Sequence, residues 1–166
     1  WTHFETQLKT TKTPEEIARI RQSGKILGGI LRRLKAEVAP GVKLMDLERL
    51  TRTLLDLAGG TTSFLGYLSE GSREPYPFAL CTSVNEIVVH GRPSSYVLKS
   101  GDILKLDLGV AWEGGMTDAA VTIPVGSVSE EASKLIRITK NALNEAVRAA
   151  HPGNTIGDIG LAIQRA

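Results

Sequence analysis

The sequence predicts one α+β domain, because helical and strand-like patterns occur in separate blocks along the chain. Apolar residues recur at helical spacing over residues 14–38 and again over about 45–58. Shorter strand-like runs follow between residues 61 and 125, and two further helices are predicted from residue 129 onward. The 166 residues, 42% hydrophobic and 23% charged, are enough for one domain with a substantial core.

The helices are predicted from their end signals. Thr13-Pro14-Glu15-Glu16 supplies a capping threonine, a proline for the first helical position and a reciprocating glutamate. Pro40-Gly41 ends this helix, and Gly59-Gly60 ends a second one that runs from about Met45 to Ala58. Ser129 caps a third helix, whose first turn is acidic, and a last helix begins near Thr155.

We expect one face of each of the first three helices to lie in the core, and residues 1–12 to form a loose lead-in. The expected buried positions are Ile17, Ile20, Leu27, Ile30, Leu31, Leu34 and Val38, then Leu47, Leu50, Leu54 and Leu57, then Leu135, Thr139, Ala142, Leu143, Ala146, Val147 and Ala150. Strands are predicted at 61–65, 79–84 and 87–89, with a loop over 66–77 and a long hairpin over 103–125.

Two aspartates stand inside the apolar runs of the predicted hairpin. Asp107 lies among leucines, and Asp118 precedes an alanine- and valine-rich run. An ionised carboxylate in such a strand costs several kcal/mol unless something compensates it, and two on one face raise each other's pKa. A divalent cation between them would remove both penalties. The alternative is that both point to solvent on a half-exposed hairpin.

The position of the turn decides whether these aspartates can meet. We expect both to project from adjacent antiparallel strands onto one face, with the register bringing them opposite each other. A tight turn at Gly114-Gly115 would leave them about four residues out of register. The turn is therefore predicted to be centred earlier, or to contain a bulge.

Composition excludes several classes of function. A net charge of +2, with the basic residues scattered, predicts no affinity for nucleic acid. No apolar run is long enough to span a membrane. A single cysteine, Cys81, forms no internal disulfide and is typical of the reducing cytoplasm.

Two stretches of the chain resemble each other. Residues 40–47, PGVKLMDL, match residues 152–159, PGNTIGDI, and each follows a long amphipathic helix that opens with Glu-Glu. Either this is a chance similarity of two helix starts, or the chain contains an internal duplication. Under the second interpretation, which we favour, a first repeat covers about 13–126 and a second begins over 127–166, all within one domain over 13–166.

The segment CTSVNEIVVHGRP at 81–93 resembles the signature of type I methionine aminopeptidases, as does LKSGDI at 98–103 followed by Asp107 and Asp118. The similarity extends from Thr13 to Ala166. It implies the duplicated α+β "pita-bread" fold, here the first repeat and the opening helices of the second. It also implies metal-dependent removal of N-terminal methionine from peptides and nascent chains, in the cytoplasm and near the ribosome.

Site roles follow from this resemblance. Asp107 matches a bidentate ligand of one divalent ion, and Asp118 matches a ligand that bridges two ions, whose identity could be Co, Mn, Fe, Zn or Ni. His90 matches a residue that holds or protonates substrate. Tyr76 and Cys81 match positions lining the methionine side-chain pocket. The backbone carbonyls near Asn85 and Ile87 match a monovalent-cation site.

The chain also departs from the family pattern. The family completes its metal site with one histidine and two glutamates from its second half, and none of these matches a residue up to Ala166. Ala119-Ala120 stands where the family usually has hydroxyl residues, which weakens the support of the neighbouring ligand. We therefore expect the 166-residue chain alone to bind metal weakly and to be inactive. Two alternatives are a proline-directed aminopeptidase of the same fold and a catalytically inactive module that binds peptides or proteins.

Overall fold

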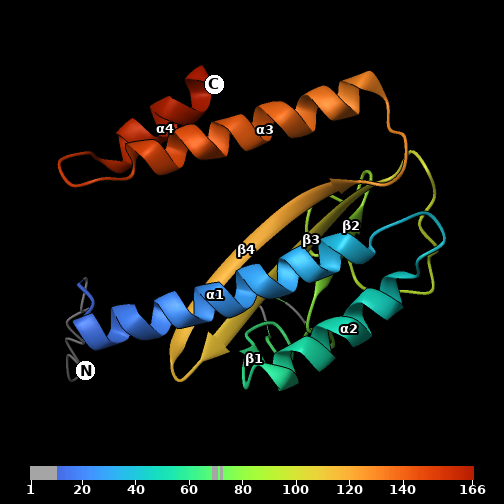
Figure 1. Cartoon of the computed structure of the whole chain (residues 1–166), viewed down its shortest axis with the longest axis horizontal. Helices are drawn as coiled ribbons and strands as arrows, with labels where there is room; N and C mark the ends of the chain where they lie inside the picture. Colours follow the sequence, from blue (N-terminus) through green and yellow to red (C-terminus); the bar gives the residue numbers. More distant parts are fainter. Residues whose placement is uncertain (1–10, 69–70, 72) are drawn as a thin grey trace.

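A pair of helices, an antiparallel sheet and a second pair of helices follow one another along the chain (Figure 1). This computed structural model describes residues 11–68, 71 and 73–166, so most of the predicted lead-in over 1–12 lies outside the described residues. The elements are α1 (Pro14–Glu37), α2 (Leu44–Leu57), β1 (Thr61–Thr62), β2 (Cys81–Val84), β3 (Ile103–Trp112), β4 (Gly115–Pro124), α3 (Glu130–Ala149) and α4 (Ile156–Arg165).

The predicted helix starts are confirmed. The Thr13 hydroxyl accepts the Glu16 N–H, and the Glu16 carboxylate accepts the Thr13 N–H at 2.7 Å, which completes the capping box of α1. The Ser129 hydroxyl accepts the Ala132 N–H at the start of α3. Thr155 forms a second capping box at the start of α4. Local chemistry therefore sets where these helices begin.

Strand β3 is the centre of the sheet. It pairs along its whole length with β4, so β1 and β2 must share its other edge, β1 opposite Val110 and Ala111 and β2 opposite residues 104–107. All three pairings are antiparallel. In the described part of the chain the outer edge of β4 carries no strand.

The β3–β4 turn is centred before Gly114-Gly115, which confirms that part of the prediction. Trp112 pairs with Gly115, so Glu113 and Gly114 are the two loop residues, and their positive φ values of 45° and 80° indicate a type I′ turn. The turn is thus centred one residue earlier than Gly114-Gly115, and the register contains no bulge.

Side-chain alternation divides the two faces of the sheet. Leu104, Leu106, Leu108 and Val110 are fully buried against the helices α1 and α2, which cover one face (Figure 1). The core cluster continues into these helices through Leu27, Ile30, Leu31, Leu34, Leu44, Leu47 and Leu55. The intervening residues of β3, including Asp107, therefore point to the opposite face.

Three predicted strands differ from the structure. The strand at 61–65 is reduced to Thr61–Thr62, and no strand forms at 87–89. After β2 the chain turns back instead, and Thr82 donates its N–H to the Gly91 carbonyl at 2.7 Å. The strand expected at 79–84 begins only at Cys81, because the Glu48 carboxylate takes the N–H groups of the two preceding residues.

The predicted buried faces of α1, α2 and α3 are partly wrong. On α1 the expected core residue Ile17 is 43% exposed. On α3 only Ala146 is buried, while Leu135, Leu143 and Val147 are 63%, 58% and 65% exposed. On α2 the end residue Leu57 is 80% exposed, and the buried face includes Glu48. Helical spacing shows which residues share a face, but not whether a partner covers that face. The α3–α4 pair lies apart from α1 and α2 in Figure 1.

The proposed duplication and the membrane-spanning potential of the helices can be compared with the structure. Gly41 and Gly153, at matching positions of the proposed duplication, have nearly equal φ values of 95° and 97°. The duplication and the boundaries at 13–126 and 127–166 remain predictions. Over the residues that the structure describes, none of the helices combines the length and the apolar character that crossing a membrane requires.

Candidate metal centre and substrate cavity

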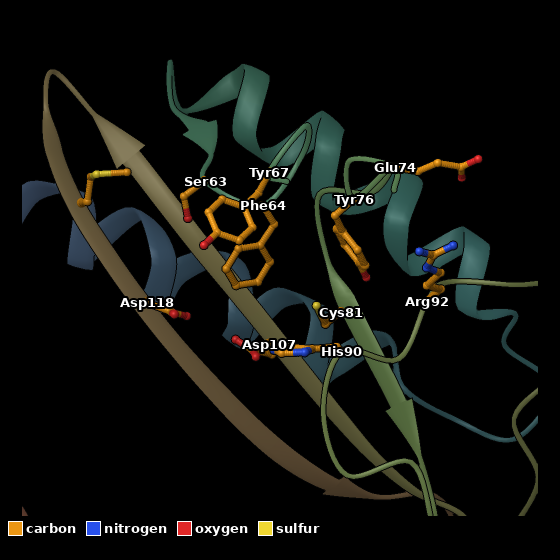
Figure 2. A pocket seen from close by; sticks show the side chains of 11 residues that line it. Ser63, Phe64, Tyr67, Glu74, Tyr76, Cys81, His90, Arg92, Asp107 and Asp118 are labelled. Atoms are coloured by element: carbon orange, nitrogen blue, oxygen red, sulfur yellow. The ribbon is translucent and has the colours of Figure 1, made fainter. Parts of the chain in front are cut away.

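A cavity of about 520 Å³ opens on the face of the sheet opposite the core (Figure 2). Five of the residues expected from the sequence line it: Tyr76, Cys81, His90, Asp107 and Asp118. The other lining residues are Ser63, Phe64, Tyr67, Glu74, Arg92 and Met116. Sequence patterns do not single out these six residues. Four of them come from the loop after β1, which carries no regular pattern.

The two aspartates project onto one face, as predicted. Asp118 pairs with Gly109, and Gly109 is two residues from Asp107 on the same side of β3. The aspartates are therefore diagonal neighbours instead of directly opposite each other, because Asp107 itself pairs with Ala120. Gly109 has no side chain, so nothing from β3 stands between the two carboxyl groups. Figure 2 shows both reaching into the same cavity.

The carboxyl pair is electrostatically strained. Burial, the negative charge of Asp118 and a hydrogen bond between the two groups raise the pKa of Asp107 to about 6. Asp107 is half-buried and Asp118 is exposed, so Asp107 bears the desolvation. A bound cation would relieve both the repulsion and the desolvation. This arrangement fits a divalent metal ion better than it fits two carboxylates solvated independently on a hairpin.

His90 lies on the return segment after β2. Figure 2 shows its imidazole directed toward Asp107, and its charge acts to lower the pKa of that carboxyl. The residue has a left-handed backbone, with φ of 57°. The next residue must be glycine, because a Cβ on Gly91 would lie 2.4 Å from the Thr82 carbonyl oxygen. The close contact of Gly91 with β2 therefore fixes where His90 points.

Tyr76 and Cys81 form a wall of the cavity. The Tyr76 hydroxyl donates to the Leu80 carbonyl at 3.0 Å, with the Gly91 carbonyl also within 3.3 Å. Burial and the neighbouring Cys81 raise the pKa of Tyr76, and burial raises the pKa of the Cys81 thiol. Both groups are therefore neutral at pH 7. They suit an apolar subsite rather than nucleophilic chemistry.

A second wall stands over β3. A Cβ on Gly109 would lie 2.0 Å from the Ser63 hydroxyl and 2.9 Å from the Phe64 ring, so the absence of a side chain lets the loop after β1 approach the sheet. Tyr67 and Tyr76 close this loop, since the Tyr76 N–H donates to the Tyr67 carbonyl at 2.8 Å. The cavity thus combines aromatic walls with an acidic floor.

At the predicted monovalent-cation site, one of the two expected carbonyl oxygens already has a cationic partner within the chain. The Asn85 carbonyl already accepts a hydrogen bond from Lys105 Nζ at 2.7 Å. Ile87 follows in the same turn, with its N–H bonded to the Val84 carbonyl. Partial burial lowers the pKa of Lys105, and the nearby Glu86 carboxylate acts in the opposite direction.

The divalent site is incomplete within the described residues. Across residues 11–68, 71 and 73–166, no group of three or more His, Cys, Asp or Glu side chains is placed to hold a metal ion. The Asp107–Asp118 pair offers hard oxygen ligands, which suit a divalent cation, but too few of them for a catalytic site.

Comparisons with known proteins agree with this arrangement. The profile of metallopeptidase family M24 matches residues 18–166. The chain belongs to this family. It is 42% identical over 154 residues to methionine aminopeptidase of Clostridium perfringens, covering 93% of this chain and 59% of the relative. It is 41% identical over 149 residues to the Aquifex aeolicus methionine aminopeptidase, covering 89% and 58%.

Solved structures of the family confirm the predicted pita-bread α+β fold. The crystal structure of methionine aminopeptidase from Thermotoga maritima superposes with a TM-score of 0.86 at 37% identity, covering 93% of this chain and 60% of that one. Prolidase from Pyrococcus furiosus, at 24% identity and a TM-score of 0.75, shares the fold. The chain thus spans about three fifths of the length of these methionine aminopeptidases.

Proposed function

We propose that the whole protein is a methionine aminopeptidase, which removes the N-terminal methionine of peptides and nascent chains by metal-dependent hydrolysis. The single observation that carries the proposal is the Asp107–Asp118 pair at the floor of the cavity. Membership of a metallopeptidase family supports it, as does 42% identity to a methionine aminopeptidase. We place the activity in the cytoplasm, close to the ribosome, where nascent chains emerge.

Asp107 and Asp118 are the proposed ligands of two divalent metal ions of the Co, Mn, Fe, Zn or Ni class. Both side chains would hold these ions through their carboxylate oxygens, which are hard ligands that suit divalent cations. Such ions, when bound, activate water and polarise the scissile carbonyl. The remaining ligands, by family resemblance one histidine and two glutamates, come from the part of the relatives' length that this chain does not span.

Different residues of the cavity bind the methionine side chain and the scissile amide of the substrate. The methionine side chain lies against the half-buried Tyr76 and the buried Cys81, whose neutral groups provide an apolar subsite with the Phe64 ring. His90, directed toward Asp107, holds the scissile amide and supplies a proton to it. Small residues are preferred after the methionine, as the family resemblance implies.

The test is a substrate comparison on the full-length protein loaded with Mn²⁺ or Co²⁺. Met-Ala-Ser should release free methionine, an Ala-Pro peptide should remain intact, and a chelator should abolish turnover. Preferential cleavage of the Ala-Pro peptide would instead assign the proline-directed activity. Metal-independent cleavage of Met-Ala-Ser would exclude the two-metal mechanism.

A catalytically inactive peptide-binding module is the second candidate. It is favoured by Ala119-Ala120, both exposed beside Asp118 and without hydroxyl groups to orient that ligand. Metal content separates the two candidates. A full-length protein that binds two ions per chain supports the enzyme, and one that binds peptide without metal supports the module. The 166-residue chain alone should show no chelator-sensitive turnover, unless a partner subunit supplies ligands.

A further inference from the structure

The segment between β2 and Gly91 carries His90, and two side chains from the cavity face of the sheet hold it in place. Ser83 Oγ accepts the Gly91 N–H at 2.9 Å, at the far end of the segment. Lys105 Nζ donates to the Asn85 carbonyl at 2.7 Å, at the near end. Ser83 and Lys105 are cross-strand partners, so both ties start from one position in the sheet.

Hydrogen bonds of the Asn85 backbone and side chain fix the orientation of its carbonyl. Asn85 has a left-handed backbone, with φ of 50°. The NH₂ group of its side chain donates to the Asp102 carboxylate at 2.9 Å, and the oxygen of its side chain accepts the Ile103 backbone N–H at 2.9 Å. Its own N–H donates to the Ile103 carbonyl at 2.9 Å, so the residue is held on both sides. The backbone carbonyl of Asn85 accepts its hydrogen bond from the Lys105 ammonium at 2.7 Å.

Backbone carbonyls of this kind bind either an ammonium group or a free alkali cation, because both satisfy the oxygen with positive charge. The Lys105 ammonium is covalently tethered two residues from Asp107 on the same side of β3. Because this ammonium already lies 2.7 Å from the Asn85 carbonyl oxygen, it competes with dissolved cations for that oxygen. A free cation would have to displace this group to reach the Asn85 carbonyl.

We propose that Lys105 is a positioning residue whose ammonium replaces a free monovalent cation at Asn85 and orders the segment that presents His90. The role given to His90 rests on the proposed function, whereas the cation replacement does not. The protein should therefore be indifferent to Na⁺ and K⁺, and removal of the Lys105 side chain should create a dependence on them.

The experiment measures melting temperature in 150 mM KCl, NaCl or tetramethylammonium chloride, at equal ionic strength, on the metal-free full-length protein. Wild type should melt at the same temperature in all three salts. Lys105→Ala should lose roughly 3–8 °C in tetramethylammonium and regain at least half of that loss in KCl or NaCl. Lys105→Met keeps the aliphatic stem and fills the space, so it should lose stability without rescue.

Three further measurements make the result specific. Lys105→Arg retains the charge and should remain indifferent to the salt. Lys134→Ala, on the exposed surface of α3, should change nothing. Hydrogen exchange of the peptide covering 85–91 should accelerate in Lys105→Ala and slow again with K⁺. A wild-type melting temperature that rises with K⁺, or a Lys105→Ala loss that no cation rescues, would overturn the proposal. Neither readout uses activity, so failure of the proposed function leaves the test intact.

Discussion

Replacing Glu48 by glutamine should destabilise the protein far more than the same substitution at a solvent-exposed glutamate of a helix. The Glu48 side chain is buried on α2, and its carboxylate accepts the N–H groups of Ala79 and Leu80 and the Nε–H of Arg52, at 2.7–3.0 Å for the shortest contact of each. A glutamine amide retains one acceptor oxygen but presents a donor to the other buried N–H. One unsatisfied buried N–H costs about 1–3 kcal/mol.

The loss of the ion pair adds less than the unsatisfied N–H. The Arg52 side chain is 44% exposed and also donates to the Pro77 carbonyl, so solvent and that carbonyl compensate most of its loss. The total is about 2–3 kcal/mol, which corresponds to a melting temperature lower by roughly 4–12 °C. Circular dichroism melts of wild type and Glu48→Gln measure it directly.

The matched control is Glu37→Gln on α1, which removes the charge from an exposed ion pair with Arg33. Its effect should stay within about 0.5 kcal/mol, because exposed pairs contribute little. Equal melting temperatures for Glu48→Gln and Glu37→Gln would refute the reasoning that the Glu48 carboxylate anchors the chain leading into β2.

Two further predictions concern the glycine beside His90 and the carboxylate beside Asn85. Gly91→Ala should cost about 1–3 kcal/mol of stability and lower turnover, because its Cβ meets backbone atoms of β2. Gly29→Ala has no atom near the added Cβ and should instead stabilise α1 by about 0.5–1 kcal/mol. Thermal melts compare the two variants. Burial raises the pKa of Asp102, but hydrogen bonds from Asn85, the Lys99 N–H and Tyr96 outweigh it and leave the pKa below its ordinary value. Its stabilisation is therefore complete above the unfolded-state pKa and lost as pH falls through the lower folded-state pKa, so Asp102→Asn should flatten the acid limb of a melting-temperature profile and leave neutral-pH slopes unchanged.

Local chemistry made much of the fold predictable. The capping box of Thr13 and Glu16 fixed the start of α1, and the glycine-rich turn with its flanking apolar runs identified the hairpin. Placing the turn earlier than Gly114-Gly115 required only the demand that the two carboxylates lie close together, and the observed register makes them diagonal neighbours. These features depend on residues close together in sequence, and single-sequence patterns report them well.

The features that were predicted wrongly depend on contacts between residues far apart in the sequence. Residues 87–89 look like a strand, but Gly91 bonds back to β2 and makes the segment a return loop. The stripe on α3 predicted a buried face, and nothing in helical spacing shows whether a partner covers it. Glu48 was detectable as an acid among the apolar positions of α2, but its partners lie 31 and 32 residues away.

The aspartates and the histidine of the candidate site were predictable from the sequence, whereas the loop after β1 that forms one of its walls was not. Asp107 and Asp118 stand out because carboxylates are unusual in apolar strands, and the signature around His90 is specific. Phe64 and Glu74 belong to an irregular loop whose path depends on contacts with Gly109 and on the hydrogen bond from the Tyr76 N–H to the Tyr67 carbonyl. The Lys105–Asn85 hydrogen bond needed the three-dimensional register of β2 and β3.

The most direct test of the metal centre is turnover of Met-Ala-Ser by the metal-loaded full-length protein and its Asp118→Ala variant. Because Asp118 is exposed and contributes no core packing, the variant should keep the melting temperature of the metal-free wild type. The control Asp46→Ala removes an exposed carboxylate of α2 and should retain full activity. Asp118→Ala should abolish turnover. A variant that folds normally and keeps a tenth or more of wild-type turnover, a barrier change of at most about 1.4 kcal/mol, would contradict it.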